Sequence, residues 1–92
     1  MEFLIKPANG DWPVLPSEET LHPRSFPSQS AVGWGDYRIR VGATEISFSF
    51  EAPGILVVFE GEISRETAQT IVDEIASSIA AETQQGSEIV AL

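Results

Sequence analysis

The chain of 92 residues is long enough for one domain with a modest core, and its 42% apolar and 21% charged residues are close to globular averages. It contains no cysteine, which excludes disulfides, thiol catalysis and cysteine-based metal sites. The net charge of −9 disfavours binding to nucleic acid and to anionic membranes and favours a basic partner. The alternative explanation is that the charge only keeps a small protein soluble.

The N-terminal stretch MEFLIKP is too short and too acidic for a signal peptide, and no apolar run approaches the roughly 20 residues that span a bilayer. We therefore expect a cytoplasmic protein. Within this stretch, residues 2–6 form a β-prone run that stops before Pro7, which predicts a short strand at a sheet edge.

Residues 7–32 contain five of the six prolines and show neither a strand-like nor a helix-like apolar period. A connection of this length without regular structure is unusual in a compact domain. Because Trp12 and Phe26 are too apolar for a free tail, we expect the segment to pack on the domain. Ser17 is a predicted N-cap for one helical turn that ends before Pro23.

Residues 36–41 and 44–51 alternate apolar and polar side chains, which predicts two antiparallel strands with one buried face. Gly42 and Ala43 between them suit a two-residue type II′ turn. That turn sets the register, with apolar pairs on one face and polar pairs on the other: Tyr37 with Phe48, Ile39 with Ile46, Arg38 with Ser47 and Arg40 with Glu45.

A third strand is predicted over residues 55–61, after a Pro-Gly turn of two or four residues. Either length places Val57 and Phe59 in the core and leaves Leu56 and Val58 on the opposite face. That face also carries both strand arginines, so something should cover it. The proline-rich segment is one candidate cover, through its aromatic residues, and a protein partner is the other.

A helix is predicted over residues 65–84, with Ser64 as its N-cap, one apolar stripe against the sheet, and Gly86 as its left-handed C-terminal residue. Residues 87–92 then return as a final strand. A right-handed crossover would make this strand parallel to the third one, in a mixed sheet. The predicted fold is an α+β two-layer sandwich, in which an antiparallel meander and two short terminal strands carry one long helix.

No catalytic, metal or nucleotide motif stands out. His22 is the single histidine, so no histidine pair or cluster can form, and the acidic residues are dispersed without a calcium-loop pattern. The Gly33-Trp34-Gly35 stretch precedes a strand rather than a helix and has no lysine, so it does not fit a phosphate-binding loop. We expect no cofactor and no bound metal.

These observations favour a small, acidic, non-enzymatic protein-interaction module that binds a basic protein, in the manner of an inhibitor or immunity protein, or binds copies of itself. The candidate partner-binding residues share the second face of the sheet: Arg38, Arg40, Leu56 and Val58. The alternative is a small-ligand-binding domain or minor enzyme with a pocket between segment 7–32 and the sheet. Aromatic and imidazole side chains would line that pocket: Trp12, His22, Trp34 and Tyr37.

Overall fold

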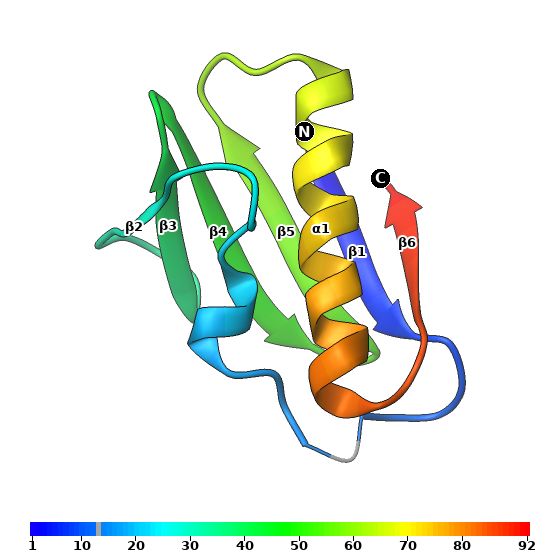
Figure 1. Ribbon diagram of the computed structural model, residues 1–92. Helices are drawn as coiled ribbons and strands as arrows, with labels where there is room; N and C mark the ends of the chain where they lie inside the picture. Colours follow the sequence, from blue (N-terminus) through cyan, green and yellow to red (C-terminus); the bar gives the residue numbers. More distant parts are fainter. Residues whose placement is uncertain (13) are drawn as a thin grey trace.

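The computed structural model describes residues 1–12 and 14–92 and shows one long helix packed on a six-stranded sheet (Figure 1). The strands run in the order β2-β3-β4-β5-β1-β6. In chain order the elements are β1 (Glu2–Pro7), the 3-10 helix η1 (Glu18–Leu21), β2 (Gln29–Ser30), β3 (Tyr37–Val41), β4 (Thr44–Glu51), β5 (Gly54–Glu60), α1 (Arg65–Thr83) and β6 (Ser87–Ala91). The predicted α+β two-layer sandwich is confirmed.

The central meander β3-β4-β5 has the predicted register. Ile39 pairs with Ile46 and Arg40 with Glu45, and Gly42 has a φ of 60° at the first central position of the turn, as a type II′ turn requires. The next turn has two central residues, Ala52 and Pro53, because Glu51 pairs directly with Gly54. Pro-Gly therefore does not occupy the central positions of a type II turn, but the even loop length preserves the predicted facing.

Of the two terminal strands, β6 lies at a sheet edge and β1 lies elsewhere than the sequence predicted. β1 is an inner strand, paired antiparallel with β5 through Leu4–Leu56 and with β6 through Leu4–Val90. β6 does run in the direction of β5, but β1 lies between them, so every pair of neighbouring strands is antiparallel and the sheet is not mixed. The prediction of β1 at an edge failed because the crossover through α1 leaves space for one strand, and β1 fills it.

Helix α1 buries its predicted stripe against the sheet. The Ser64 side chain accepts a hydrogen bond from the Thr67 backbone N–H, as expected of an N-cap. The core has no exposed member and joins both layers: Phe3, Ile5, Ile39, Ile46, Phe48, Ile55, Val57, Phe59, Ala68, Ile71, Val72, Ile75, Ala76 and Ile79, with Leu21 from η1. The helix ends at Thr83, and the left-handed residue that follows it is Gln84, with a φ of 59°, and not the predicted Gly86.

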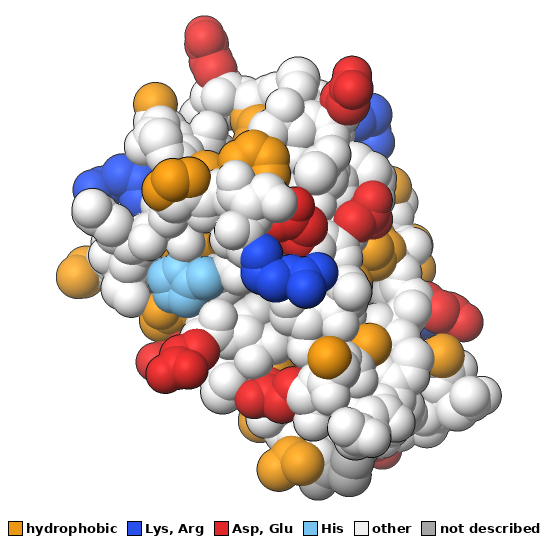
Figure 2. All heavy atoms as spheres, in the orientation of Figure 1, with side chains coloured by type: hydrophobic (Ala, Val, Ile, Leu, Met, Phe, Trp, Pro, Cys, Tyr) orange, Lys and Arg blue, Asp and Glu red, His pale blue; other side chains and the backbone are white. Residues whose placement is uncertain are grey.

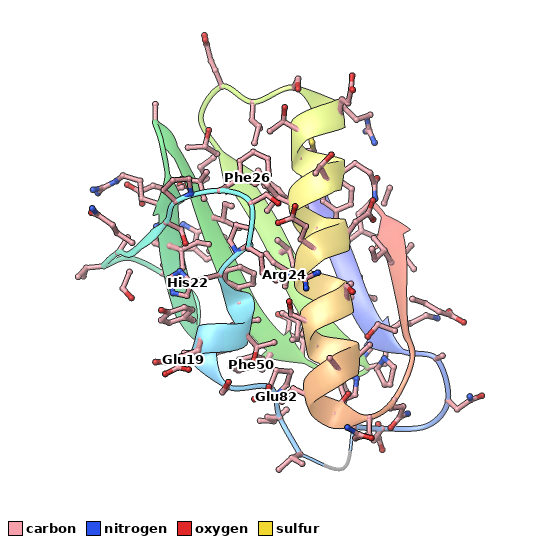
Figure 3. The ribbon with its side chains drawn as sticks, in the orientation of Figure 1. Glu19, His22, Arg24, Phe26, Phe50 and Glu82 are labelled. Carbon is pink, nitrogen blue, oxygen red and sulfur yellow. The ribbon has the colours of Figure 1, made fainter. Side chains whose placement is uncertain are left out.

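Residues 17–26, here called the strap, lie on the same side of the sheet as α1 (Figures 1 and 3). Leu21 is fully buried and Phe26 packs on the core. The segment therefore extends the helix layer over β3 and β4, and the prediction that it covers Leu56 and Val58 is wrong. One helix is too narrow to cover six strands. The apolar side chains of β3 and β4 on the helix side, Ile39 and Ile46 among them, therefore need the strap as a cover.

Two carboxylates of α1 hold the strap. Glu82 accepts hydrogen bonds from the Ser17 backbone N–H (2.8 Å), the Ser17 hydroxyl (2.8 Å) and the Thr20 hydroxyl (2.9 Å). Glu74 accepts one from the Ser25 backbone N–H at 2.8 Å. Ser17 thus precedes the predicted turn, but its side chain donates to Glu82 instead of capping η1. Glu82 lies near the C-terminal, negative end of the α1 dipole, where a carboxylate is unfavourable. The hydrogen bonds from the strap offset this cost.

We expect acidification to release the strap. The backbone N–H and hydroxyl of Ser17 hold the pKa of Glu82 below its ordinary value, and hydrogen bonds from Ser25 lower the pKa of Glu74. Because folding lowers both pKa values, their stabilising contribution is complete at neutral pH and is lost as pH falls through the folded-state values. Urea unfolding should show a free energy of unfolding that decreases below about pH 4.5, the ordinary pKa of these groups.

The Glu82→Gln substitution isolates this contact at neutral pH. Hydrogen exchange of the Ser17 amide should accelerate by about 3- to 10-fold, since an acceptor carboxylate is lost from an exposed site. Glu62→Gln, at the opposite end of the helix, removes the same charge and should leave the Ser17 exchange rate unchanged. Equal acceleration in both variants would show that the effect is one of net charge and not of the strap contact.

Candidate functional site

The sheet surface opposite α1, here called the open face, carries a row of apolar side chains. Leu4 pairs across the strands with Leu56 on one side and Val90 on the other, so the three residues lie in line over β5, β1 and β6. Val58 continues the patch along β5, next to Ser47 and Glu2. We call Leu4, Leu56, Val58 and Val90 the apolar row. It is the most extensive apolar feature of the open face.

The apolar row is accessible from solvent. Leu4, Leu56 and Val58 are partly exposed and Val90 is 37% exposed. In Figure 1, α1 and the strap lie in front of the sheet, and no described helix or strand lies behind it. The predicted facing of Leu56 and Val58 is therefore observed, while their role in binding stays a prediction.

The other half of the open face is closed by a short loop. Gly33 lies over the Arg38 side chain, where a Cβ atom would be 2.6 Å from the Arg38 Cδ, and Gly35 lies on β4 with a φ of 98°. The Trp34 indole N–H donates to a Glu60 carboxylate oxygen at 2.9 Å, and the Arg38 guanidinium lies 5.5 Å from the centre of the indole ring. The Gly-Trp-Gly stretch is thus a cover for an arginine.

Arg38 lies between two carboxylates. Its side chain is only 8% exposed, and it donates to Glu45 and to Glu60, each at 2.5 Å. Glu45 and Glu60 face each other directly across β4 and β5, an arrangement that is destabilising without a cation between them. The hydrogen bond to Glu45 raises the pKa of Arg38, and the same bond lowers the pKa of Glu45. Arg38 therefore stabilises the sheet itself.

The open face is less acidic than the rest of the chain: by register it carries three cations and five carboxylates, Glu2, Glu45, Glu51, Glu60 and Glu88. Three of the five cations lie there, and each has a carboxylate within 4 Å: Lys6 with Glu88 (3.7 Å), Arg40 with Glu45 (3.5 Å), and Arg38 as above. Arg40 remains 52% exposed and available for a contact. On the helix side, by contrast, acidic side chains are scattered with few cations among them (Figure 2).

The four residues of the predicted pocket lie in three places. His22 and Tyr37 are in contact, with the imidazole Nε2 2.7 Å from the Tyr37 hydroxyl. The imidazole Nδ1 lies 2.6 Å from the Ser28 hydroxyl, so this chain of polar groups ties the strap to β3. Trp34 lies on the open face, as described, and Trp12 lies at the far end of the sheet beside the β4-β5 turn. The structure does not bring the four together.

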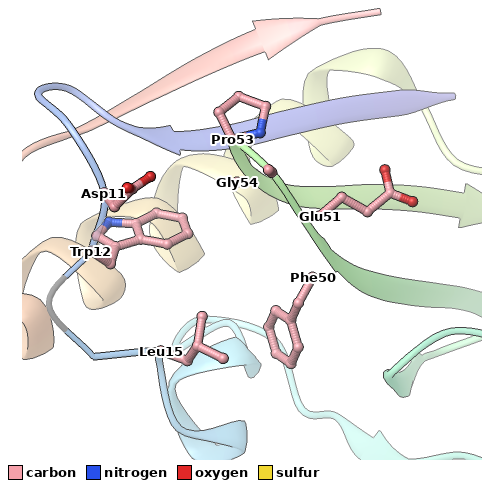
Figure 4. Close-up of a pocket in the computed structure, with 8 residues that line it drawn as sticks. Asp11, Trp12, Leu15, Phe50, Glu51, Pro53 and Gly54 are labelled. Atoms are coloured by element: carbon pink, nitrogen blue, oxygen red, sulfur yellow. The ribbon is translucent and has the colours of Figure 1, made fainter.

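A pocket of about 270 Å³ lies at this end, between the segment before the strap and the β4-β5 turn (Figure 4). It has apolar walls and acidic residues at its rim, and is lined by Asp11, Trp12, Leu15, Phe50, Glu51, Ala52, Pro53 and Gly54. Trp12 and Phe50 also pack on the core. Phe50 lies on the core-facing side of β4 and is only partly buried, because it stands at the end of the strand.

No protein-family model, curated protein or solved structure matches the chain. In residues 1–12 and 14–92, His, Asp and Glu side chains form no group of three that could hold a metal ion. Within the same residues, no helix has the length and apolarity needed to cross a membrane. The interpretation of the site therefore rests on its own geometry.

Sequence reasoning missed two members of the apolar row, Leu4 and Val90. Leu4 lies between Glu2 and Lys6 on the outward side of the run EFLIK, and both alternating sets of the run SEIVAL are partly apolar. Neither run indicates which strands lie beside it. The row is seen only once β1 is placed between β5 and β6, and both of these pairings are nonlocal.

We expect Arg38→Met to destabilise the protein at pH 7 by about 2 kcal/mol, because the substitution leaves Glu45 and Glu60 unbalanced across the strands. In the native protein, the hydrogen bond from Arg38 lowers the pKa of Glu45, so the difference in stability between the two proteins should be largest at neutral pH and should shrink as pH falls through the folded-state value. Urea unfolding at several pH values measures this difference. Adding Glu60→Gln to the variant removes one of the two facing carboxylates and should restore part of the lost stability; no recovery in the double variant would contradict the explanation.

Proposed function

We propose that this protein is a protein-interaction module whose contact surface is the open face. The observation that carries the proposal is the apolar row, in which Val90, Leu4 and Leu56 stand in line across three strands without a covering layer. Exposed apolar patches bordered by polar residues commonly mark protein contacts. The border here is polar and includes the exposed Arg40, a residue type frequent at interfaces.

The occupant that fits this surface best is a second copy of the chain. Two molecules with a charge of −9 repel each other, but three of the five cations lie on the open face in ion pairs, so the acidic excess there is smaller than on the rest of the surface. The open face is therefore the side on which two copies can approach with least repulsion. A two-fold arrangement would bury both apolar rows against each other and place Lys6 or Arg40 of one copy near glutamates of its partner.

A basic protein is the other occupant consistent with the composition. The acidic excess of the helix side would steer such a partner, as in an inhibitor or immunity protein. The two arrangements differ in their salt dependence. Added salt weakens association with a basic partner, whereas it strengthens self-association by screening the repulsion between copies.

Self-association is tested by sedimentation velocity between about 10 μM and 1 mM, the range in which interfaces of modest size dissociate. We expect a concentration-dependent dimer that Val58→Lys weakens by at least about 10-fold, since a buried valine contributes roughly 1.5 kcal/mol or more. Val32→Lys is the matched control, because Val32 is fully exposed in a loop and the change in charge and side chain is identical. It should leave the dimer intact.

A monomer at every concentration, or equal weakening by both variants, would reject self-association through the open face. A photo-crosslinking residue at position 56 then tests the module itself in the native extract, with position 77 on the exposed side of α1 as the control. A crosslinked protein that appears only from position 56 and is lost with Val58→Lys supports a different partner on the same face. The absence of any such product would overturn the proposed function.

A further inference from the structure

The pocket at the β4-β5 turn has the shape and chemistry of a site for a single side chain. Its volume of about 270 Å³ lies just below the range of roughly 300–1,000 Å³ that is typical of small-molecule sites. Figure 4 shows Trp12, Leu15 and Phe50 around the hollow, with Pro53 and Gly54 on the side of the sheet. Leu15 is 64% exposed, so the mouth of the pocket is open to solvent.

Both charged residues in the lining of the pocket are negative. Its lining contains Asp11 and Glu51, and none of the five cations of the chain. The Asp11 carboxylate lies beside the Trp12 indole, whereas the Glu51 carboxylate points along β4 away from the hollow (Figure 4). An anionic ligand would meet this charge and the overall charge of −9 without compensation, so the pocket disfavours it.

Two aromatic side chains next to a carboxylate favour an elongated cation. The indole and phenyl faces attract a positive head group, and Leu15 and Pro53 can cover an aliphatic stem. Lysine and arginine side chains have this combination of an apolar stem and a charged end. We propose that the pocket binds a lysine or arginine side chain of another polypeptide, between Trp12 and Phe50 and next to Asp11.

This site is separate from the open face. Phe50 belongs to the strand surface that faces α1, and the pocket lies at the end of the sheet, so binding there does not depend on the apolar row. The pocket therefore goes beyond the proposed function. A test with a small probe leaves the two proposals independent, because failure of the probe to bind says nothing about association through Leu56 and Val58.

The probe is Nα-acetyl-lysine methylamide, titrated against the full-length ¹⁵N-labelled chain. The indole N–H signals of Trp12 and Trp34 are two reporters in one spectrum, and Trp34, on the open face, is the internal control. We expect saturable shifts of the Trp12 indole and of the Phe50 and Gly54 amides, without a shift of Trp34. The norleucine analogue, which has the same stem without the ammonium, should bind at least about 3-fold more weakly.

Two isosteric variants separate a local contact from a general charge effect. Asp11→Asn and Glu51→Gln each remove one negative charge from the pocket lining. Asp11→Asn should weaken the lysine probe by about 3- to 10-fold, and Glu51→Gln by much less, because only the Asp11 carboxylate lies beside the indole. Equal affinity for the two analogues, equal effects of the two variants, or no shift at Trp12 would each overturn the proposal.

Discussion

The structure depends on one geometric constraint: a single helix must cover a six-stranded sheet whose inner strand β5 is apolar on both faces. Helix α1 covers one side of β5 with its isoleucine stripe and is too narrow to reach β3. The strap therefore completes the helix layer, and Leu21 from η1 becomes a fully buried core residue. On the reverse side, no helix or strand of the described residues forms a second layer, and the surface there has a charged half around Arg38 and an apolar half, the apolar row.

The charged half of the open face is organised around Arg38. The register of β4 and β5 places Glu45 opposite Glu60, and Arg38 on β3 donates a hydrogen bond to each, with Arg40 as a second cation beside Glu45. Trp34 covers the guanidinium, and the two glycines beside it allow the loop to approach Arg38 and β4 closely. The same register therefore explains the acidic pair, the buried cation and the glycines. The apolar row lies beyond this cluster, where no loop reaches.

The parts of this fold that could be predicted from sequence are those with two chemically different faces. In β3 and β4, arginines alternate with apolar residues, so one register satisfies both faces and a slip is costly. β1 also has distinct faces, with Phe3 and Ile5 on one side and Glu2 and Lys6 on the other, but its neighbours β5 and β6 are distant in sequence and no local pattern specifies them. Its inner position could therefore not be predicted from the sequence. The position of the strap could not be predicted for a related reason: its aromatic residues indicate packing on the domain, but they do not specify a side of the sheet.

The candidate sites follow the same division. Leu56 and Val58 could be identified because the hairpin register assigns each strand residue to a face. The pocket could not, because it depends on Trp12 lying beside the end of a strand nearly 40 residues later in the chain. Such a nonlocal contact leaves no local sequence pattern.

The two edges of the sheet, β2 and β6, differ in how well they are protected from pairing with another strand. β2 has only two residues, both polar, which leaves little backbone for another strand to pair with. β6 has five residues without proline or lysine, and its Glu88 is paired with Lys6 on the neighbouring strand. Val90 belongs to both the β6 edge and the apolar row, so a second copy seated on the open face would also restrict access to that edge. The less protected edge and the apolar row therefore meet at one border of the sheet, and a single contact there would cover the apolar side chains and restrict access to the edge strand.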